Sequence, residues 1–202
     1  WFLLPRGPER KLDVVMIQPN FDPGLRAPGM EGEMWRRSDL ALARYGLPLP
    51  GRATLLLWPE SSVMGRNDAE PNPRLEAEAQ RRGVAWLYGT EGARPGDPYL
   101  RLNLVRGEAP GRPPFLQAKV VPMAFGERMP GPAAVREWLD ARFDWHSEEP
   151  GELSPRSSFA VPTPTGELAV HPLICSEALL ADRVQEGVRA AGADLLTNHT
   201  ND

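Results

Sequence analysis

The chain has 202 residues, of which 41% are hydrophobic and 25% are charged, and its formal net charge is -4. This composition is that of an ordinary globular protein, long enough to bury a sizeable core. The negative net charge and the absence of a lysine and arginine block argue against a nucleic-acid binder. The single cysteine excludes an internal disulfide. No apolar run reaches the roughly 20 residues that span a bilayer.

Strand-like and helix-like patterns alternate in the first half of the chain. A nearly continuous apolar run predicts a strand over residues 12–18 that is covered on both faces. A second buried strand is expected over residues 53–58 and a third strand over residues 84–89. Helical composition predicts a helix over residues 32–45. A second helix is expected to begin at Asn72-Pro73 and to end at Gly83, because asparagine caps helices, proline suits the first turn and glycine ends them.

Hairpins interrupt this alternation in the second half. The expected elements are a hairpin of residues 99–106 with 114–120, a short helix over 133–139, a hairpin of 157–161 with 167–174, a helix over 178–191 and a strand over 193–197. Strands that alternate with both helices and hairpins predict a mixed α/β sandwich instead of a purely parallel sheet.

Two of the helices are expected to bury an apolar stripe, because amphipathic helices turn such a stripe toward the core. In the helix over residues 32–45 the stripe consists of Met34, Leu40, Leu42 and Ala43. In the helix over residues 178–191 it consists of Leu179, Leu180, Val184 and Val188.

Residues 168–177 carry the only cysteine, Cys175, at the end of an apolar strand and just before a helical segment. A helix N-terminus favours the thiolate, which is the reactive form of the side chain, so Cys175 is a candidate nucleophile. A lone cysteine in an apolar run is more often a small buried hydrophobe. The choice between these interpretations depends on polar residues elsewhere in the chain.

Two such residues also follow apolar strands: Glu60 after Leu-Leu-Leu-Trp-Pro, and Lys119 after Phe-Leu-Gln-Ala. Buried or half-buried Glu and Lys are rare without a partner. Together with Cys175 they meet the needs of acyl transfer through a thioester. Cys175 is the nucleophile, Glu60 the general base, and Lys119 the group that holds the oxyanion and lowers the pKa of the cysteine. The alternative for Lys119 alone is a surface salt bridge.

A Cys/His pair competes with this interpretation. His171 lies four residues before Cys175, which on a strand is about 13 Å and beyond hydrogen-bond reach. His146 and His199 have no recognisable context. Three scattered histidines and one cysteine also lack the spacing of a metal site, so no metal and no cofactor are expected.

The residues in this order resemble the nitrilase, or carbon-nitrogen hydrolase, superfamily, whose hallmark is a Glu-Lys-Cys triad. Within it the chain most resembles the apolipoprotein N-acyltransferases. The matching motifs are Trp58-Pro-Glu60, Lys119 followed by Phe125-Gly-Glu127 and Pro130, Ile174-Cys-Ser-Glu177, Thr197 with Asn201-Asp202, and Gln18-Pro-Asn20. The first four of these motifs in the right order and spacing are far more specific than any one of them, and Gln18-Pro-Asn20 also fits.

The resemblance implies an α-β-β-α sandwich of two mixed sheets. Residues 11–202 would form the catalytic domain, and residues 1–10 would be the remnant of a preceding membrane segment or linker. Family members continue beyond Asn201-Asp202 into Trp-Phe-Gly and further strands, so the domain is expected to be incomplete at its C-terminal end.

The resemblance also implies a function. The enzyme would move a fatty acyl chain from a phospholipid to Cys175, and then to the N-terminal diacylglyceryl-cysteine of an apolipoprotein. It would act on the periplasmic face of the bacterial cytoplasmic membrane, held there by segments outside this chain. The family also uses the glutamates that match Glu127 and Glu177. Glu127 would anchor Lys119 or orient Glu60, and Glu177 would shape the pocket without touching the sulfur.

Three departures from the family pattern concern substrate fit. Ser176 stands where the family has tyrosine, residues 122–124 read Pro-Met-Ala in place of Leu-Val-Pro, and residues 25–27 lack the usual Lys-Trp. Two alternatives therefore stay open: a soluble amidase acting on small amides, and a catalytically silent domain that keeps the fold. Phe-Gly-Glu and Trp58 favour the acyltransferase. Exposed apolar side chains at residues 128–129 or 143–145 would favour a membrane enzyme.

Overall fold

The computed structural model describes residues 10–18, 30–63, 73–94, 97–125, 127–128, 131–143, 150 and 158–200. Its elements, in chain order, are β1 (Leu12–Met16), α1 (Met30–Tyr45), β2 (Ala53–Leu57), α2 (Pro73–Arg82), β3 (Ala85–Arg94), β4 (Asp97–Glu108), β5 (Phe115–Ala118), α3 (Ala133–Phe143), β6 (Phe159–Thr163), β7 (Gly166–Ile174), the 3-10 helix η1 (Cys175–Leu179), α4 (Ala181–Arg189) and β8 (Leu195–His199). Within these ranges, no helix has the length and apolarity needed to cross a bilayer.

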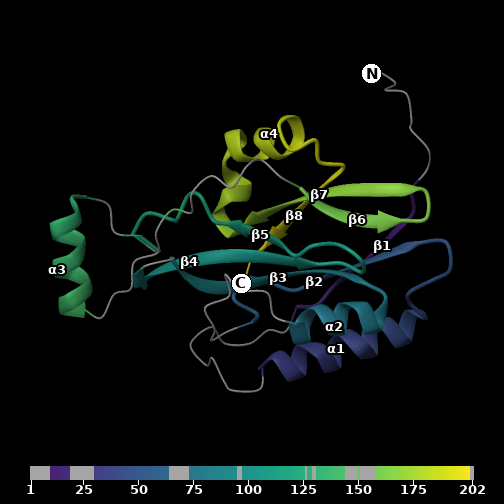
Figure 1. The fold of residues 1–202 in the computed structure, drawn as a ribbon. Helices are drawn as coiled ribbons and strands as arrows, with labels where there is room; N and C mark the ends of the chain where they lie inside the picture. The colour runs from purple at the N-terminus through teal and green to yellow at the C-terminus, as the bar shows by residue number, and fades with distance from the viewer. Residues whose placement is uncertain are drawn as a thin grey trace.

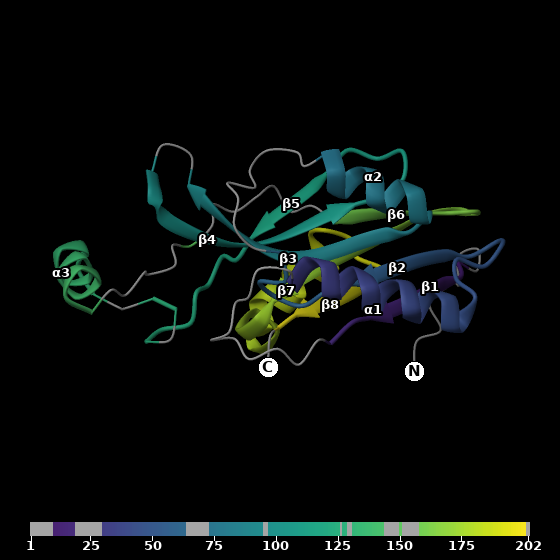
Figure 2. The same cartoon turned by 90° about the horizontal axis from the view of Figure 1, so that it is seen from below.

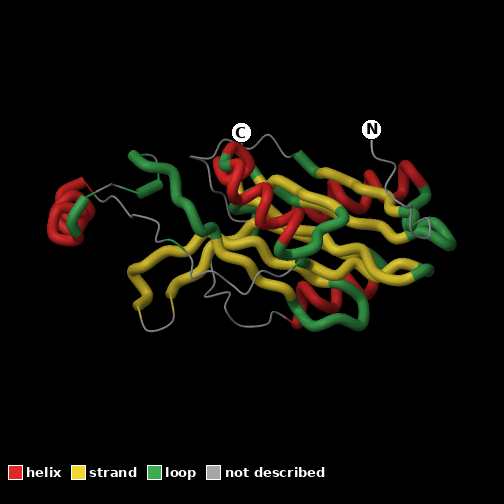
Figure 3. Tube along the Cα trace, turned by 90° about the horizontal axis from the view of Figure 1, so that it is seen from above, coloured by secondary structure: helices red, strands yellow, loops and turns green. Residues whose placement is uncertain are grey.

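The strands form two mixed sheets. The larger has the order β1-β2-β3-β4-β5, with β1, β2 and β3 parallel and with β4 and β5 each antiparallel to its predecessor. The smaller has the order β6-β7-β8, with an antiparallel and a parallel pair. The sheets lie face to face, with α1 and α2 along the outer face of the larger sheet and α4 outside the smaller one (Figures 1 and 2). The predicted α-β-β-α sandwich is confirmed, and α3 stands apart from it (Figure 3).

Strand β2 is buried on both faces, which explains its largely apolar sequence. All five of its residues are buried. Because side chains alternate along a strand, Leu55 and Leu57 face the smaller sheet and pack in the core between the sheets, with Ile174 among others. Leu56 and the following Trp58 face the helices and pack in the second core, beneath α1 and α2. The one polar residue inside the strand, Thr54, is small and buried, and the first charged residue, Glu60, comes after the strand has ended.

Aromatic rings fill the helix-side core. The ring centroids of Trp35, Trp58 and Trp86 lie 4.4 to 4.6 Å apart, and Tyr88 stacks on Trp86 at 4.1 Å. The indole Nε1 of Trp58 donates to the Ser38 hydroxyl of α1 at 2.9 Å. Trp58 is thus a core residue whose side chain fixes the end of β2 to α1.

The expectation that the first strand is covered on both faces is wrong. β1 is an edge strand of the larger sheet, and Val14 and Met16 are 45% and 76% exposed. In α1, Met34 and Leu42 are buried as expected, but Leu40 is 57% exposed. Leu40 and β1 line an open groove at this edge. A continuous apolar run therefore did not distinguish an edge strand from a central one.

The expected helix over residues 178–191 is also partly wrong. The structure divides it into η1 and α4, and the expected stripe points outward, with Leu179 87% and Val188 51% exposed. The face of α4 toward the sheet instead carries the buried Arg183 and Gly187. A Cβ on Gly187 would lie 2.6 Å from Cδ2 of His171, so the backbone of α4 at Gly187 packs directly against the His171 ring. Helix amphipathicity is a poor guide where the contact is made by glycine.

The antiparallel pair of β3 and β4 was not predicted. The third strand was expected to end at Gly89, but β3 continues to Arg94 and pairs with β4 from Trp86↔Glu108 to Arg94↔Asp97. The two expected hairpins, β4 with β5 and β6 with β7, are confirmed as antiparallel pairs. β3 ends at Arg94 and β4 begins at Asp97, so the two paired strands follow one another closely in the chain.

We expect Trp58→Ala to lower the free energy of unfolding by about 3–5 kcal/mol, because truncating a buried aromatic side chain leaves a cavity. The matched control is Trp138→Ala, since Trp138 is 61% exposed; surface substitutions usually change stability by less than about 0.5 kcal/mol. Urea unfolding of both variants checks the difference. Equal losses would contradict the placement of Trp58 at the centre of the core.

Candidate active site

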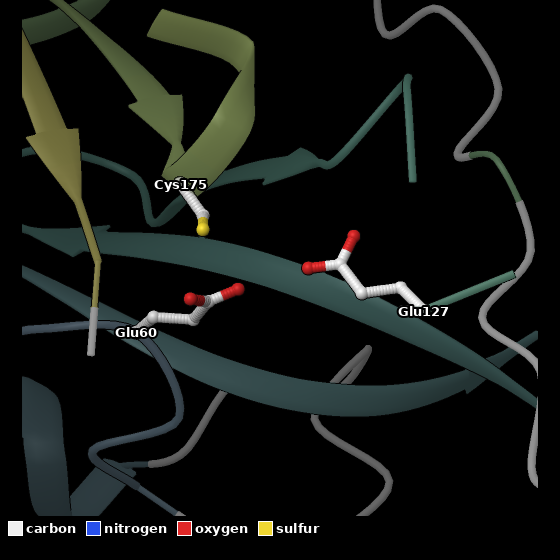
Figure 4. A group of neighbouring side chains, drawn as sticks. All are labelled: Glu60, Glu127 and Cys175. Atoms are coloured by element: carbon white, nitrogen blue, oxygen red, sulfur yellow. The ribbon is translucent and has the colours of Figure 1, made fainter. Parts of the chain in front are cut away.

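Strand direction brings the predicted site residues to one edge of the sandwich. β5 is antiparallel to β4, which is antiparallel to β3, so β5 runs in the same direction as β2 and β3. Glu60 follows β2 and Lys119 follows β5, and both therefore emerge at the carboxyl ends of their strands. Cys175 follows β7 of the facing sheet. Figure 4 shows Cys175 and the carboxylates of Glu60 and Glu127 turned toward one another from three different segments.

Cys175 lies in a sharp turn at the end of β7, just before a helix, as the sequence predicts. Its φ angle is +50°, a conformation uncommon for a residue other than glycine. Ile174 before it ends β7 in an extended conformation, and η1 begins at Cys175 itself. Residues held in sparsely populated backbone regions cluster at functional sites, where the surrounding structure maintains them. The turn projects the thiol out of the strand and toward the facing sheet.

The acidic and thiol groups of the site converge closely. One carboxylate oxygen each of Glu60 and Glu127 and the sulfur of Cys175 all lie within 4.8 Å of one another. The ammonium of Lys119 is 2.5 Å from Oε1 of Glu127 and 3.6 Å from Oε1 of Glu60. Such a donor set is also the kind that binds metals, and here the lysine supplies a positive charge among the donors.

Burial decides the electrostatics of the lysine. The side chain of Lys119 is 1% exposed, and a buried ammonium is costly unless it is paired. Burial alone would lower the pKa of Lys119, but the hydrogen bond with Glu127 and the charges of Glu60 and Glu127 outweigh it and raise that pKa above its usual value. The lysine is therefore a fixed cation.

Burial also raises the pKa of Glu60 above its usual value, and hydrogen bonds from Asn103 and Lys119 offset this rise only in part. The same effect corrects the sequence-based expectation for the thiol. Burial first, and then the negative charge of Glu60, raise the pKa of Cys175, although Lys119 and Thr200 oppose the rise. The expected lowering of this pKa is wrong, because the helix start and the lysine do not outweigh burial. A protonated thiol needs a base, and carboxylate oxygens of both Glu60 and Glu127 lie within 4.8 Å of the other site atoms. Glu127 is bound at 2.5 Å to Lys119 and accepts from the N–H of Met123, so Glu60 is the candidate for the base.

Asn103 of β4 is a site residue that the sequence analysis missed. Its side-chain amide donates to Oε1 of Glu60, and its backbone carbonyl accepts from the backbone N–H of Lys119 at 2.8 Å. Asn103 thus contacts two of the three expected triad members. The sequence does place Asn103 on the opposite face of the strand from Leu102 and Leu104. An asparagine buried in a strand needs a hydrogen-bond partner, and this could have marked Asn103 as a candidate.

Gly89 positions the loop that carries Glu60. A Cβ on Gly89 would lie 2.4 Å from Cα of Glu60, so only glycine lets the two backbones approach this closely. The Gly89 N–H donates to the carbonyl of Pro59 at 3.1 Å, and the Gly89 carbonyl accepts from the N–H groups of Ser62 and Val63. A glycine inside a predicted strand was the signal for this contact.

Glu127 closes a short loop against the site. Its Oε2 accepts from the N–H of Met123 at 2.6 Å while its Oε1 binds Lys119. The backbone N–H of Glu127 in turn donates to the Met123 carbonyl at 2.9 Å. Phe125, between them, has a φ of +64° and is 69% exposed. The contact of Glu127 with Lys119 is the one expected for an anchor of the lysine.

Glu177 is fully buried and joins the two sheets. Its Oε1 accepts from the backbone N–H groups of Val120 and Val121 at 2.8 and 3.3 Å, and its Oε2 accepts from that of Ile174 at 3.1 Å. Arg183 of α4 lies 3.7 Å away and balances the charge. Glu177 therefore fixes the segment after Lys119 against the segment before Cys175.

The histidines have other surroundings than a Cys/His pair requires. His199 is 2% exposed; its Nδ1 lies 2.8 Å from the Trp58 carbonyl and its Nε2 lies 3.3 Å from the Thr197 hydroxyl. Burial lowers the pKa of His199 to about 4, so the ring is neutral near pH 7. His171 packs against Gly187 of α4. His146 lies outside the described residues.

Solved structures show the class to which this fold belongs. An amidase of the nitrilase superfamily from Nesterenkonia AN1 superposes with a TM-score of 0.60 at 17% identity, over 95% of this chain and 66% of that one. A carbon-nitrogen hydrolase from Helicobacter pylori G27 gives 0.58 at 15% identity, over 94% of this chain and 59% of that one. The chain therefore has the nitrilase fold.

In sequence, the chain is similar to apolipoprotein N-acyltransferases. The protein of that name from Sinorhizobium fredii is 29% identical over 208 residues, and the one from Allorhizobium ampelinum is 26% identical over 211. Each match covers 98% of this chain but only 37% and 38% of the relative, so the chain spans well under half their length. No family model matches the chain.

We expect Gly89→Ala to lower the free energy of unfolding by about 1–3 kcal/mol, because the added methyl displaces the Glu60 backbone. Gly32→Ala is the control: Gly32 lies in α1 with nothing within 4 Å of the added Cβ, so the exchange should stabilise the helix by about 0.5–1 kcal/mol. Urea unfolding measures both. A Gly89 variant as stable as wild type would show that the loop can move away without cost.

Proposed function

We propose that this chain is the catalytic domain of an acyltransferase that works through a thioester on Cys175. The observation that carries this proposal is the convergence of Glu60, Glu127 and Cys175 within 4.8 Å around a buried Lys119. It supports the triad roles because a nucleophile, a base and a fixed cation are the three groups that acyl transfer requires.

In the first half of the reaction, Glu60 takes the proton of the Cys175 thiol, and the sulfur attacks the ester carbonyl carbon of a phospholipid. The carbonyl oxygen becomes negative and is stabilised by the ammonium of Lys119. The carbon–oxygen bond of the ester then breaks, and Glu60 returns the proton to the departing lysophospholipid. The fatty acyl chain is left as a thioester on Cys175.

In the second half, the α-amino group of a diacylglyceryl-cysteine at an apolipoprotein N-terminus attacks the thioester. Its proton passes to Glu60, the carbon–sulfur bond breaks, and the thiol of Cys175 regains a proton from Glu60. The raised pKa of Glu60 suits a group that must both accept and return a proton. Donor and acceptor balance without a cofactor, and Glu127 holds Lys119 in place throughout.

Apolar side chains beside the site support a lipid substrate. Between Lys119 and Glu127, Val121, Met123 and Phe125 are 39%, 48% and 69% exposed. Exposed apolar side chains at residues 128–129 or 143–145 would also favour a membrane enzyme, but Met129 and residues 144–145 lie outside the described residues. The exposed side chains of Val121, Met123 and Phe125 favour an enzyme that acts at a membrane surface. We place this enzyme on the periplasmic face of the cytoplasmic membrane.

A small-amide hydrolase is the second candidate, because a solved structure of the same fold is an amidase. Trp58 does not help to separate the acyltransferase from the amidase, because its side chain is buried in the core and does not face the site. The third candidate is a catalytically silent domain, for which the side chains of Glu60, Lys119 and Cys175 would lie apart. Their close approach argues against this candidate.

Incubation of the whole natural protein with phospholipid in detergent should add the mass of a fatty acyl chain, in a form that hydroxylamine removes. Cys175→Ala should give no adduct, because the thioester needs the sulfur. Glu60→Gln should form the adduct roughly 10²- to 10⁴-fold more slowly, because the general base is lost. Intact-mass spectrometry measures each variant. Release of ammonia from simple amides without an adduct would favour the amidase.

The rate of adduct formation should fall as the pH falls through the pKa of Glu60, which lies above its ordinary value of 4.5. Protonated Glu60 cannot take the thiol proton, so the loss occurs on the acid side. Asn103→Leu removes a hydrogen bond that lowers this pKa, and should move the acid limb to higher pH. Initial rates between about pH 4 and about pH 9 give both profiles; an unmoved limb would contradict the role of Asn103.

A further inference from the structure

The two halves of the site lie on different sheets. Glu60 and Lys119 leave strands of the larger sheet, and Cys175 leaves β7 of the smaller one. The hydrogen bonds within each sheet do not set the distance between the sheets. Because thiol and base must approach closely for proton transfer, contacts that join the sheets at the site have a direct effect on the reaction.

The lysine side of the site has two such contacts. Glu177 binds the backbone N–H groups of Val120 and Val121, as described above. The side chain of Gln117 in β5 donates to the Pro172 carbonyl of β7 at 2.8 Å. Lys119 lies between these two contacts in sequence, so its position relative to the smaller sheet is fixed on both sides.

On the Glu60 side, His199 at the end of β8 makes the connection. The register pairs His199 with Ile174, the residue before Cys175. Its ring crosses to the larger sheet, where Nδ1 lies 2.8 Å from the carbonyl of Trp58, two residues before Glu60. A carbonyl only accepts, so Nδ1 carries the proton and Nε2 accepts from the hydroxyl of Thr197. The ring is neutral near pH 7, which keeps these roles fixed.

The next residue touches the nucleophile. The Thr200 hydroxyl donates to the sulfur of Cys175 at 3.8 Å, a long contact of the kind that sulfur accepts. We propose that His199 and Thr200 at the end of β8 are positioning residues: His199 holds the Glu60 loop at reaction distance from Cys175, and Thr200 orients the thiol. This inference rests on the proposed roles of Glu60 as base and Cys175 as nucleophile.

The test measures how fast Cys175 of the whole protein forms the hydroxylamine-labile fatty-acyl adduct from phospholipid in detergent, by intact mass, across a range of pH. Adduct formation depends on Glu60 because a proton must leave the thiol and another must reach the departing lysophospholipid. Glu60→Gln is the reference and should slow the adduct near pH 7 at least tenfold, even though the loss of its negative charge lowers the pKa of the thiol. The rate of this variant should rise with pH as the fraction of thiolate rises. A wild-type protein that forms no adduct overturns the proposed function, and this inference with it.

Two amides provide matched variants of His199. His199→Asn places an N–H close to the position of Nδ1 and should stay within about threefold of the wild-type rate near pH 7. His199→Gln places its N–H close to the position of Nε2, away from Trp58, and should slow formation of the acyl adduct about tenfold, with a rate that rises with pH as in Glu60→Gln. Thr200→Val should slow it a few-fold. Urea unfolding of each variant confirms that it is folded.

The possible failures are distinguishable. If Glu60→Gln is slow but His199→Gln reacts like wild type, the positioning role of His199 is wrong and the proposed function stands. If Glu60→Gln itself reacts like wild type, the proposed base is wrong, and the inference fails with it. A His199→Gln rate that stays low at every pH would show a purely structural defect and would also overturn the inference. If neither His199 variant folds, a wild-type rate in Thr200→Val contradicts the proposal.

Discussion

The pairing of one buried ammonium governs the candidate site. An amino group with 1% exposure would lose its charge unless acidic partners stood beside it, and Glu60 and Glu127 are those partners. Each partner is in turn held by backbone: Glu127 by the N–H of Met123, and the Glu60 loop by the close approach of Gly89. The buried charge of Lys119 is therefore stable only if the loops that carry Glu60 and Glu127 are both ordered. The two loops lie at the same edge of the sandwich.

This arrangement differs from sites that store a thiolate. There, a helix N-terminus or a histidine lowers the thiol pKa, and the nucleophile is ready before substrate arrives. Here burial and the carboxylate of Glu60 keep the proton on Cys175. In the proposed reaction the same carboxylate removes that proton, so activation would belong to the pair and not to the cysteine alone.

Sequence reasoning reached the fold and the three central side chains because each follows an apolar strand, and strand exits are visible as the first polar residue of a run. It failed where tertiary packing decides. Gly187 turned the apolar stripe of α4 to solvent, and burial reversed the expected pKa shift of Cys175. Asn103 and His199 contact their partners across long sequence separations, and nothing in their local sequence states which carbonyl or carboxylate they will meet.

A cysteine that rests in its protonated form has a consequence for oxidative damage. Peroxides and disulfides react with the thiolate, so the rate of oxidation follows the fraction of sulfur that is ionised. By raising the pKa of Cys175, the site lowers that fraction. The sulfur is thereby protected chemically against oxidation, whereas an oxidised low-pKa cysteine needs a reductant to restore it.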